Sequence, residues 1–111
     1  MTDLHEKQCQ SCSADTPALD SATVASYKAE LSDRWTVVND NTCLEGVFKF
    51  KDYYRTQAFV NAVAFIAHRE DHHPDISFGY NKATIHLTTH AINALSDNDF
   101  ICAAKIDRLL D

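Results

Sequence analysis

The chain has 111 residues, a length typical of one domain with one hydrophobic core. Hydrophobic residues make up 45% of it, and no apolar run reaches the length of a membrane helix, so we expect no membrane partner. The net charge of −6 argues against nucleic acid as the main partner, because phosphate binding needs clustered positive charge. The two glycines, Gly46 and Gly79, lie far apart, which excludes a glycine-rich phosphate loop. Five of the six histidines fall between residues 68 and 90, and this bias needs an explanation.

Residues 1–19 are polar and aperiodic, and we interpret them as a flexible leader ahead of a single domain over residues 20–111. The N-terminus lacks the apolar run and cleavage pattern of a secretory signal, which favours a cytoplasmic location. Cys9 and Cys12 in the leader form a Cys-x-x-Cys pair. A zinc site would need a second ligand pair, and a redox motif would lie between a strand and a helix, so we favour two thiols on a mobile tail. Cys43 and Cys102 have apolar neighbours and are interpreted as core residues.

The first half of the domain predicts one helix and two strands. Asp20 is a candidate N-cap for a helix of about three turns, which runs to Leu31. Residues 35–38 predict a short strand, residues 39–41 a turn, and residues 44–51 a second strand. One side of that second strand carries Leu44, Gly46, Phe48 and Phe50.

The second half repeats this order and adds a last helix. Asp52 can cap a helix that runs to about Asp71, and Pro74 bars its extension. Strands are predicted over 75–80 and 83–88, and Ser96 with Asp99 resembles a capping box before the final helix. Strand pairs joined by tight turns imply an antiparallel sheet. We therefore predict an α+β fold, a four-stranded antiparallel sheet with three helices packed on one face in the order α-β-β-α-β-β-α.

The second hairpin predicts where the histidines meet. A two-residue turn at 81–82 would pair Tyr80 with Ala83, Phe78 with Ile85 and Ile76 with Leu87, all on an apolar face. Extended outward, this register brings His73 opposite His90 on the polar face. His72 is adjacent, and His68 lies one helical turn before it.

Three interpretations of the cluster are open: solvated surface residues, a metal site, and metal-free acid–base catalysis. His68 and His72 have the i, i+4 spacing that metals use, but the intervening residues do not match the zincin pattern. Histidine, with a pKa near ~6.5, both donates and accepts protons at neutral pH. The convergence of several histidines therefore favours acid–base catalysis.

The pattern His-x3-His-His-Pro-x5-Tyr-x9-His-x8-Asp runs from His68 to Asp99. It resembles the signature of pterin-4a-carbinolamine dehydratases, and the resemblance covers roughly residues 20–110. It implies removal of water from 4a-hydroxytetrahydropterin to give quinonoid dihydropterin in tetrahydrobiopterin recycling, with the pterin as substrate and no metal or cofactor. It also implies a homodimer or homotetramer. The leader resembles that of bacterial members that accompany phenylalanine hydroxylase.

The resemblance also implies roles for single residues. His72 and His90 would be the general acids, and His73 would hold the pterin with some base character. The pterin pocket would further be lined by Asp71, Pro74 and Thr89. Asp99 either orients a histidine, touches substrate or only caps a helix, and Trp35 either stacks near the pterin or belongs to the core. Tyr80 is expected to be structural and His86 to lie outside the site.

Three positions depart from the family pattern. Asn98 stands where some members have an arginine before the aspartate, and Ile92 stands where some have a cysteine. His68 stands where a glutamate is common, which removes an expected negative partner of His72.

Two other functions stay open. The chain could be a regulatory or interaction protein of the same fold, or a dehydratase-like enzyme for a related pterin, because the histidine motif does not read the pterin side chain.

Overall fold

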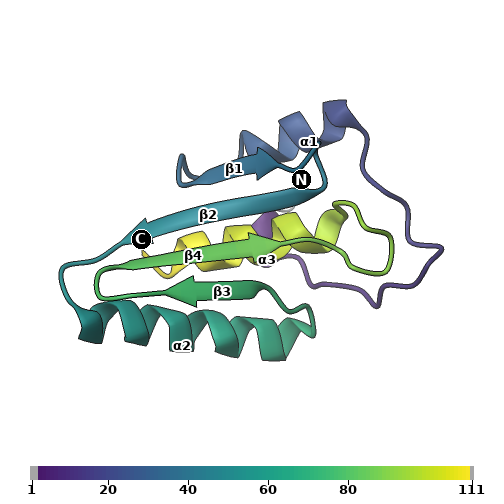
Figure 1. Ribbon diagram of the computed structural model, residues 1–111. Helices are drawn as coiled ribbons and strands as arrows, with labels where there is room; N and C mark the ends of the chain where they lie inside the picture. Colours follow the sequence, from purple (N-terminus) through teal and green to yellow (C-terminus); the bar gives the residue numbers. More distant parts are fainter. Residues whose placement is uncertain (1–2, 111) are drawn as a thin grey trace.

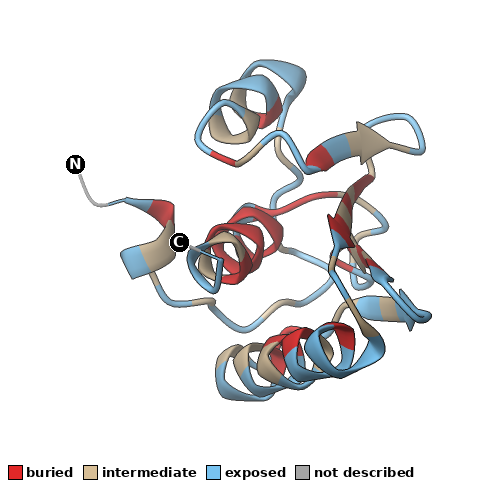
Figure 2. Ribbon diagram, turned by 90° about the vertical axis from the view of Figure 1, so that its left-hand side faces the viewer, coloured by how far each residue is buried: buried red, intermediate tan, exposed pale blue. Residues whose placement is uncertain are grey.

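The structure is a computed structural model that describes residues 3–110. Four antiparallel strands form one sheet in the order β1 (Trp35–Val38), β2 (Cys43–Lys49), β4 (Lys82–Leu87) and β3 (Asp75–Phe78) (Figure 1). The helices are α1 (Ser21–Lys28), α2 (Tyr53–Glu70) and α3 (Asp97–Arg108), preceded by a short 3-10 turn, η1 (Leu4–Glu6). All three helices lie on the same side of the sheet (Figure 2). The predicted α+β architecture and element order are confirmed.

The core lies between the sheet and α3. The sheet contributes inward-facing side chains that are fully buried, namely Leu44, Phe48, Ala83, Ile85 and Leu87. Most of α3 is also buried, including Phe100, Ile101 and Ile106. Cys43 and Cys102 are 7% and 1% exposed, as their apolar neighbours predicted. No helix within residues 3–110 has the length and apolar character needed to cross a membrane.

The helix boundaries follow local capping signals. The side chains of Asp20 and Asp52 accept the backbone N–H groups of Thr23 and Arg55, each at 2.8 Å, so both predicted N-caps are confirmed. The first helix is shorter than predicted and ends at Lys28. Leu31 is still buried, but it lies in a turn just before Ser32, whose N–H and hydroxyl both donate to Asp107 at 2.8 Å. These two hydrogen bonds draw the chain toward α3, which gives a tertiary reason why α1 ends at Lys28.

The predicted register of the second hairpin was wrong by two residues. Ile76 pairs with Ile85 and Phe78 with Ala83, so the chain turns through residues 79–82. Two contacts with other segments hold this turn: the Thr56 hydroxyl donates to the Tyr80 carbonyl at 3.1 Å, and the Phe50 N–H donates to the Asn81 carbonyl at 2.8 Å. Tyr80 is therefore 65% exposed in the turn and not on the apolar face.

A shift of two residues preserves the two faces of the hairpin, because side chains alternate with period two. The buried face still carries Ile85 and Leu87. The expected pairing of His73 with His90 is lost, however, because the observed register would place His73 opposite Thr88.

The leader makes contacts that its polar composition did not predict. Leu4 is 3% exposed, and the Lys105 ammonium group on α3 donates to the His5 carbonyl at 2.9 Å. Further along, the Leu19 N–H donates to the Leu95 carbonyl at 3.0 Å. Residues expected to form a free tail thus lie against α3 and against the loop before it.

We expect Gly46→Ala to destabilise the fold. A Cβ atom at Gly46 would lie 2.7 Å from Cζ3 of Trp35 and 2.8 Å from Cε2 of Phe48, both parts of rigid, buried rings. The free energy of unfolding, measured by urea denaturation, should fall by about 1–3 kcal/mol. Gly79→Ala is the matched control, because no atom lies within 4 Å of the position that its Cβ would take and its φ is not positive. Equal stability of the two variants would contradict this account.

Candidate active site

The turn after α2 fixes the backbone of the first histidine. Asp71 adopts the left-handed conformation with φ 54° and ψ 43°. The Asp71 N–H donates to the His68 carbonyl at 3.3 Å, and the His72 N–H donates to the Ala67 carbonyl at 3.2 Å. This is the Schellman pattern of helix termination. It folds the chain back over the last turn of α2, and Pro74 then prevents any further helix.

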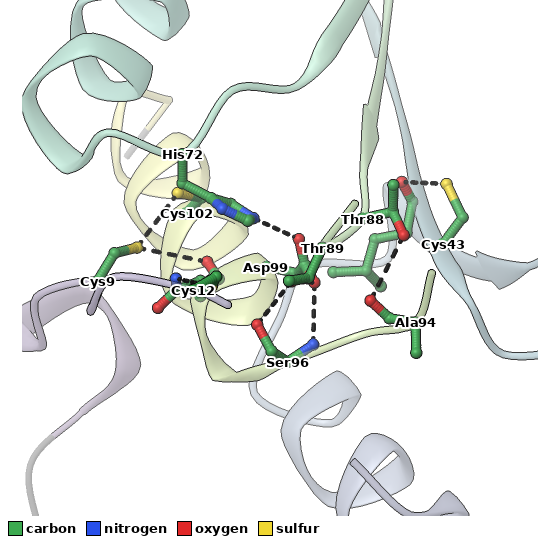
Figure 3. Close-up of polar contacts among 12 residues, drawn as sticks. Cys9, Cys12, Cys43, His72, Thr88, Thr89, Ala94, Ser96, Asp99 and Cys102 are labelled. Carbon is green, nitrogen blue, oxygen red and sulfur yellow. Dashed lines mark hydrogen bonds and ion pairs between the residues drawn. The ribbon is translucent and has the colours of Figure 1, made fainter. Parts of the chain in front are cut away.

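The central contact of the site joins His72 to the start of α3. Nε2 of His72 lies 2.6 Å from Oδ1 of Asp99, and Asp99 is fully buried while His72 is 9% exposed (Figure 3). The two residues are 27 positions apart in the sequence. A hydrogen bond of this length between an imidazole and a carboxylate is short and charge-assisted.

The second oxygen of Asp99 binds two further donors. Oδ2 accepts the Thr89 hydroxyl at 2.8 Å and the Ser96 N–H at 3.0 Å. The hydroxyls of Thr89 and Ser96 are themselves 2.6 Å apart. The contact with Ser96 belongs to the predicted capping box, which is confirmed. Asp99 therefore orients a histidine and caps a helix at the same time.

This arrangement determines what His72 can do chemically. Because Asp99 accepts a hydrogen bond from Nε2, the other ring nitrogen, Nδ1, is left to exchange a proton. When Nδ1 takes up a proton, the adjacent carboxylate offsets the positive charge of the ring and holds its orientation, as in catalytic triads. His72 is thus equipped for general acid–base chemistry.

His73 and His90 are both exposed. His73 follows His72 directly, and His90 follows Thr89, so the neighbour of each one is hydrogen-bonded to Asp99. His90 lies in a small loop that is closed by the Thr89 N–H donating to the Ala94 carbonyl at 3.0 Å. Asp71 is exposed and Pro74 is half-buried beside them.

Other predicted residues lie elsewhere. Trp35 is 1% exposed, donates its indole N–H to Oδ1 of Asp107 at 2.9 Å, and packs edge-on against Phe48. Asp107 lies eight residues after Asp99, about 12 Å further along α3. The structure thus places Trp35 in the core at the other end of this helix. His86 pairs with Glu45 on the sheet at 2.8 Å, and His68 is exposed on α2.

Two further residues, Glu70 and Asn98, make contacts next to the site that the sequence did not predict. Glu70 accepts the Cys9 N–H at 2.9 Å just before the turn that carries His72. Asn98, which is 5% exposed, pairs with the backbone of Gln10 next to Asp99. Glu70 directly precedes Asp71, and Asn98 directly precedes Asp99. Asp71 and Asp99 were both predicted site residues, but no local pattern indicated that the leader would bind beside them.

Metal-ligating side chains do not gather around His72 in the described part of the chain. Over residues 3–110, one group of three brings its ligand atoms close together, Asp3, His5 and Glu6. It is mostly exposed and lies in the leader. The residues around His72 instead form hydrogen bonds with one another.

Comparison with known proteins assigns the chain to a family. A family model described as pterin 4 alpha carbinolamine dehydratase matches residues 17–109. The chain belongs to the pterin-4a-carbinolamine dehydratase family. A protein of Legionella pneumophila (strain Corby), named "Putative pterin-4-alpha-carbinolamine dehydratase", is 49% identical over 98% of this chain and 96% of its own length. One of Nitrosospira multiformis with the same name is 53% identical over 96% of this chain and 92% of its own length.

Solved structures of the pterin dehydratase type share the fold. A transcriptional coactivator/pterin dehydratase from Brucella melitensis superposes with a TM-score of 0.80 at 27% identity, over 86% of this chain and 100% of that one. A pterin dehydratase-like protein described as a RuBisCO assembly factor in the alpha-carboxysome superposes with a TM-score of 0.60 at 29% identity. That match covers 68% of this chain and 87% of the other.

We expect Thr89→Val to disturb the site while keeping its volume. The change replaces the hydroxyl that donates to Asp99 with a methyl group, in a position that is 1% exposed. The unfolding free energy should fall by about 1–3 kcal/mol, because the buried carboxylate loses a donor. Nitrogen NMR shifts of His72 should report the altered ring environment. Thr36→Val, at an exposed position on β1, is the control and should leave these shifts unchanged. An unchanged His72 spectrum in Thr89→Val would contradict a coupling of Thr89 to His72 through Asp99.

Proposed function

We propose that the protein is a 4a-hydroxytetrahydrobiopterin dehydratase that works by histidine acid–base catalysis without a metal. The observation that carries the proposal is the buried His72–Asp99 hydrogen bond, with exposed His73 next to His72 in the sequence and exposed His90 next to Thr89, which also binds Asp99. Membership of the pterin-4a-carbinolamine dehydratase family supports the substrate class. The pterin is the substrate, and no further cofactor is invoked.

The reaction needs two proton transfers, and the histidines can supply both. The 4a-hydroxyl leaves as water after it takes a proton from an acid, while the N5 lone pair forms the C4a–N5 double bond. A base then removes the N5 proton, which gives quinonoid dihydropterin and restores the total number of protons on the enzyme. Both transfers are suited to imidazole near neutral pH.

We assign His72 and His90 as the general acids and His73 chiefly to substrate binding. Asp99 supports the role of His72, since it fixes the ring and offsets its charge when Nδ1 is protonated. Asp71, Pro74 and Thr89 would line the pterin pocket, with Thr89 and Asp99 acting mainly by position because both are buried. Trp35 would contribute through the core rather than through contact with the pterin.

The cellular setting is part of the proposal. We infer a cytoplasmic homodimer or homotetramer that regenerates pterin for an aromatic-ring hydroxylase such as phenylalanine hydroxylase. The same histidine set could act on a related pterin, because it contacts the ring system that such compounds share.

A second candidate function is protein binding. Tyr54 is 80% exposed and Phe65 is 62% exposed, and no element within residues 3–110 covers either of them on α2. Their spacing of eleven residues places them on one side of the helix. One structural relative is described as an assembly factor and another as a transcriptional coactivator. In this case the chain would bind a protein and leave the pterin unchanged.

A dehydratase assay decides between the two functions. The full chain should accelerate the loss of water from chemically generated 4a-hydroxytetrahydropterin, followed by absorbance, equally with and without EDTA. No acceleration would overturn the enzymatic proposal and favour protein binding. Activity that disappears with the chelator and returns with added metal would overturn the metal-free mechanism.

We expect His72→Ala and His90→Ala each to lower kcat by about 100-fold or more, the usual contribution of one acid–base group. The measurement is the steady-state rate under saturating substrate. His86→Gln is the matched control, because His86 pairs with Glu45 on the sheet, away from Asp99. If His86→Gln costs as much activity as His72→Ala, the assignment of the site is wrong.

His73→Ala should separate binding from chemistry. Because His73 is exposed and lacks the carboxylate partner of His72, we expect KM to rise by about tenfold and kcat to change by less than about threefold. Initial rates over a range of substrate concentrations provide both values. An effect confined to kcat would refute this division of roles.

A further inference from the structure

The leader forms a strap that joins the two segments carrying the candidate active site. We define the leader strap as residues 9–12. The Cys9 N–H donates to Oε1 of Glu70 at 2.9 Å, at the end of α2. The Gln10 N–H donates to Oδ1 of Asn98 at 3.0 Å, and Nδ2 of Asn98 donates back to the Gln10 carbonyl at 2.7 Å. The strap thus spans the end of α2, before His72, and the start of α3, before Asp99.

The thiol of Cys9 in this strap lies close to the thiol of Cys102 in α3. Sγ of Cys9 is 3.6 Å from Sγ of Cys102, which is 1% exposed on α3 (Figure 3). Cys9 is half-buried, and its Sγ also lies 3.6 Å from the Asn98 carbonyl. Cys12 is held differently, since its Sγ accepts Nδ2 of Asn98 at 3.0 Å. The described contacts therefore direct Cys9 toward Cys102 and leave Cys12 bound to a side-chain amide.

We propose that Cys9 and Cys102 are an oxidisable dithiol, and that a small-molecule disulfide converts them to a disulfide that fastens the leader strap to α3. The sulfurs must approach from 3.6 Å to a bond length of about 2.05 Å, a movement of roughly 1.5 Å. Cys9 lies in an irregular segment and can make this movement, whereas Cys102 is held inside a helix.

The exchange balances as two displacements. The Cys9 thiolate attacks one sulfur of the small disulfide, forms a mixed disulfide and releases the first small thiol. The Cys102 thiolate then attacks the Cys9 sulfur and releases the second. Two electrons pass from the protein to the small disulfide, and the two thiol protons end on the released thiols. Cys9 reacts first because it is the more exposed of the two.

The surroundings of Cys9 make this exchange slow at neutral pH. The hydrogen bond with Cys102 and the burial of Cys9 both raise the pKa of its thiol, and the nearby Glu70 carboxylate raises it further. The Lys105 ammonium group acts in the opposite direction but does not offset them. Because the thiolate is the nucleophile, the rate of oxidation should rise by about tenfold for each pH unit.

The test treats the full chain with glutathione disulfide and counts free thiols. The number of free cysteines should fall from four to two, with loss of two hydrogens in the protein mass and a peptide map that joins Cys9 to Cys102. Cleavage of the leader by an added protease should slow in the oxidised protein and recover with dithiothreitol.

Three variants identify the pair. Cys12→Ser should still form the disulfide, whereas Cys9→Ser and Cys102→Ala should not. Cys9→Ser changes a half-buried side chain in the leader and leaves the core face of α3 intact, so its result does not depend on repacking of α3. A disulfide that persists in Cys102→Ala and disappears in Cys12→Ser would identify Cys12 as the partner and overturn the proposal. A lasting mixed disulfide with glutathione and no intrachain bond would also overturn it. Neither outcome depends on dehydratase activity.

Discussion

The hydrogen bonding of the Asp99 carboxylate is the constraint on which the candidate site depends. A buried carboxylate costs several kcal/mol unless donors surround it. Here the donors come from three segments: His72 from the turn after α2, Thr89 from the end of β4, and Ser96 from the start of α3. The hydrogen bonds to this one buried group therefore fix the positions of all three segments. They also fix the backbone next to His73, which follows His72, and next to His90, which follows Thr89.

The helix that carries Asp99 organises the rest of the molecule in the same way. At its far end Asp107 accepts the Ser32 N–H and hydroxyl together with the Trp35 indole N–H. Two carboxylates on α3 thus anchor opposite parts of the chain, one around the site and one around the start of the sheet. Between them Phe100 and Ile106 fill the core, and the leader lies along the outer side of the same helix.

Solved structures that share this fold are described with different functions. The chain belongs to the pterin-4a-carbinolamine dehydratase family, yet one structural relative is described as a RuBisCO assembly factor. A shared fold leaves room for both, because activity depends on the side chains at the site and not on the scaffold. In this chain the hydrogen bonds of Asp99 and the exposed aromatic residues of α2 belong to different parts of the molecule, and each is the basis of one of the two proposed functions.

The sequence by itself determined the element order, the faces of the strands and the caps at Asp20, Asp52 and Ser96, because periodicity and capping act between residues close in the chain. Only the tertiary structure decided the hairpin register, through the contacts of Tyr80 and Asn81 with α2 and with the segment after β2. It also decided that Trp35 lies in the core and that the leader binds Asn98. These outcomes depend on hydrogen bonds between residues 24 to 88 positions apart, which no local pattern can specify.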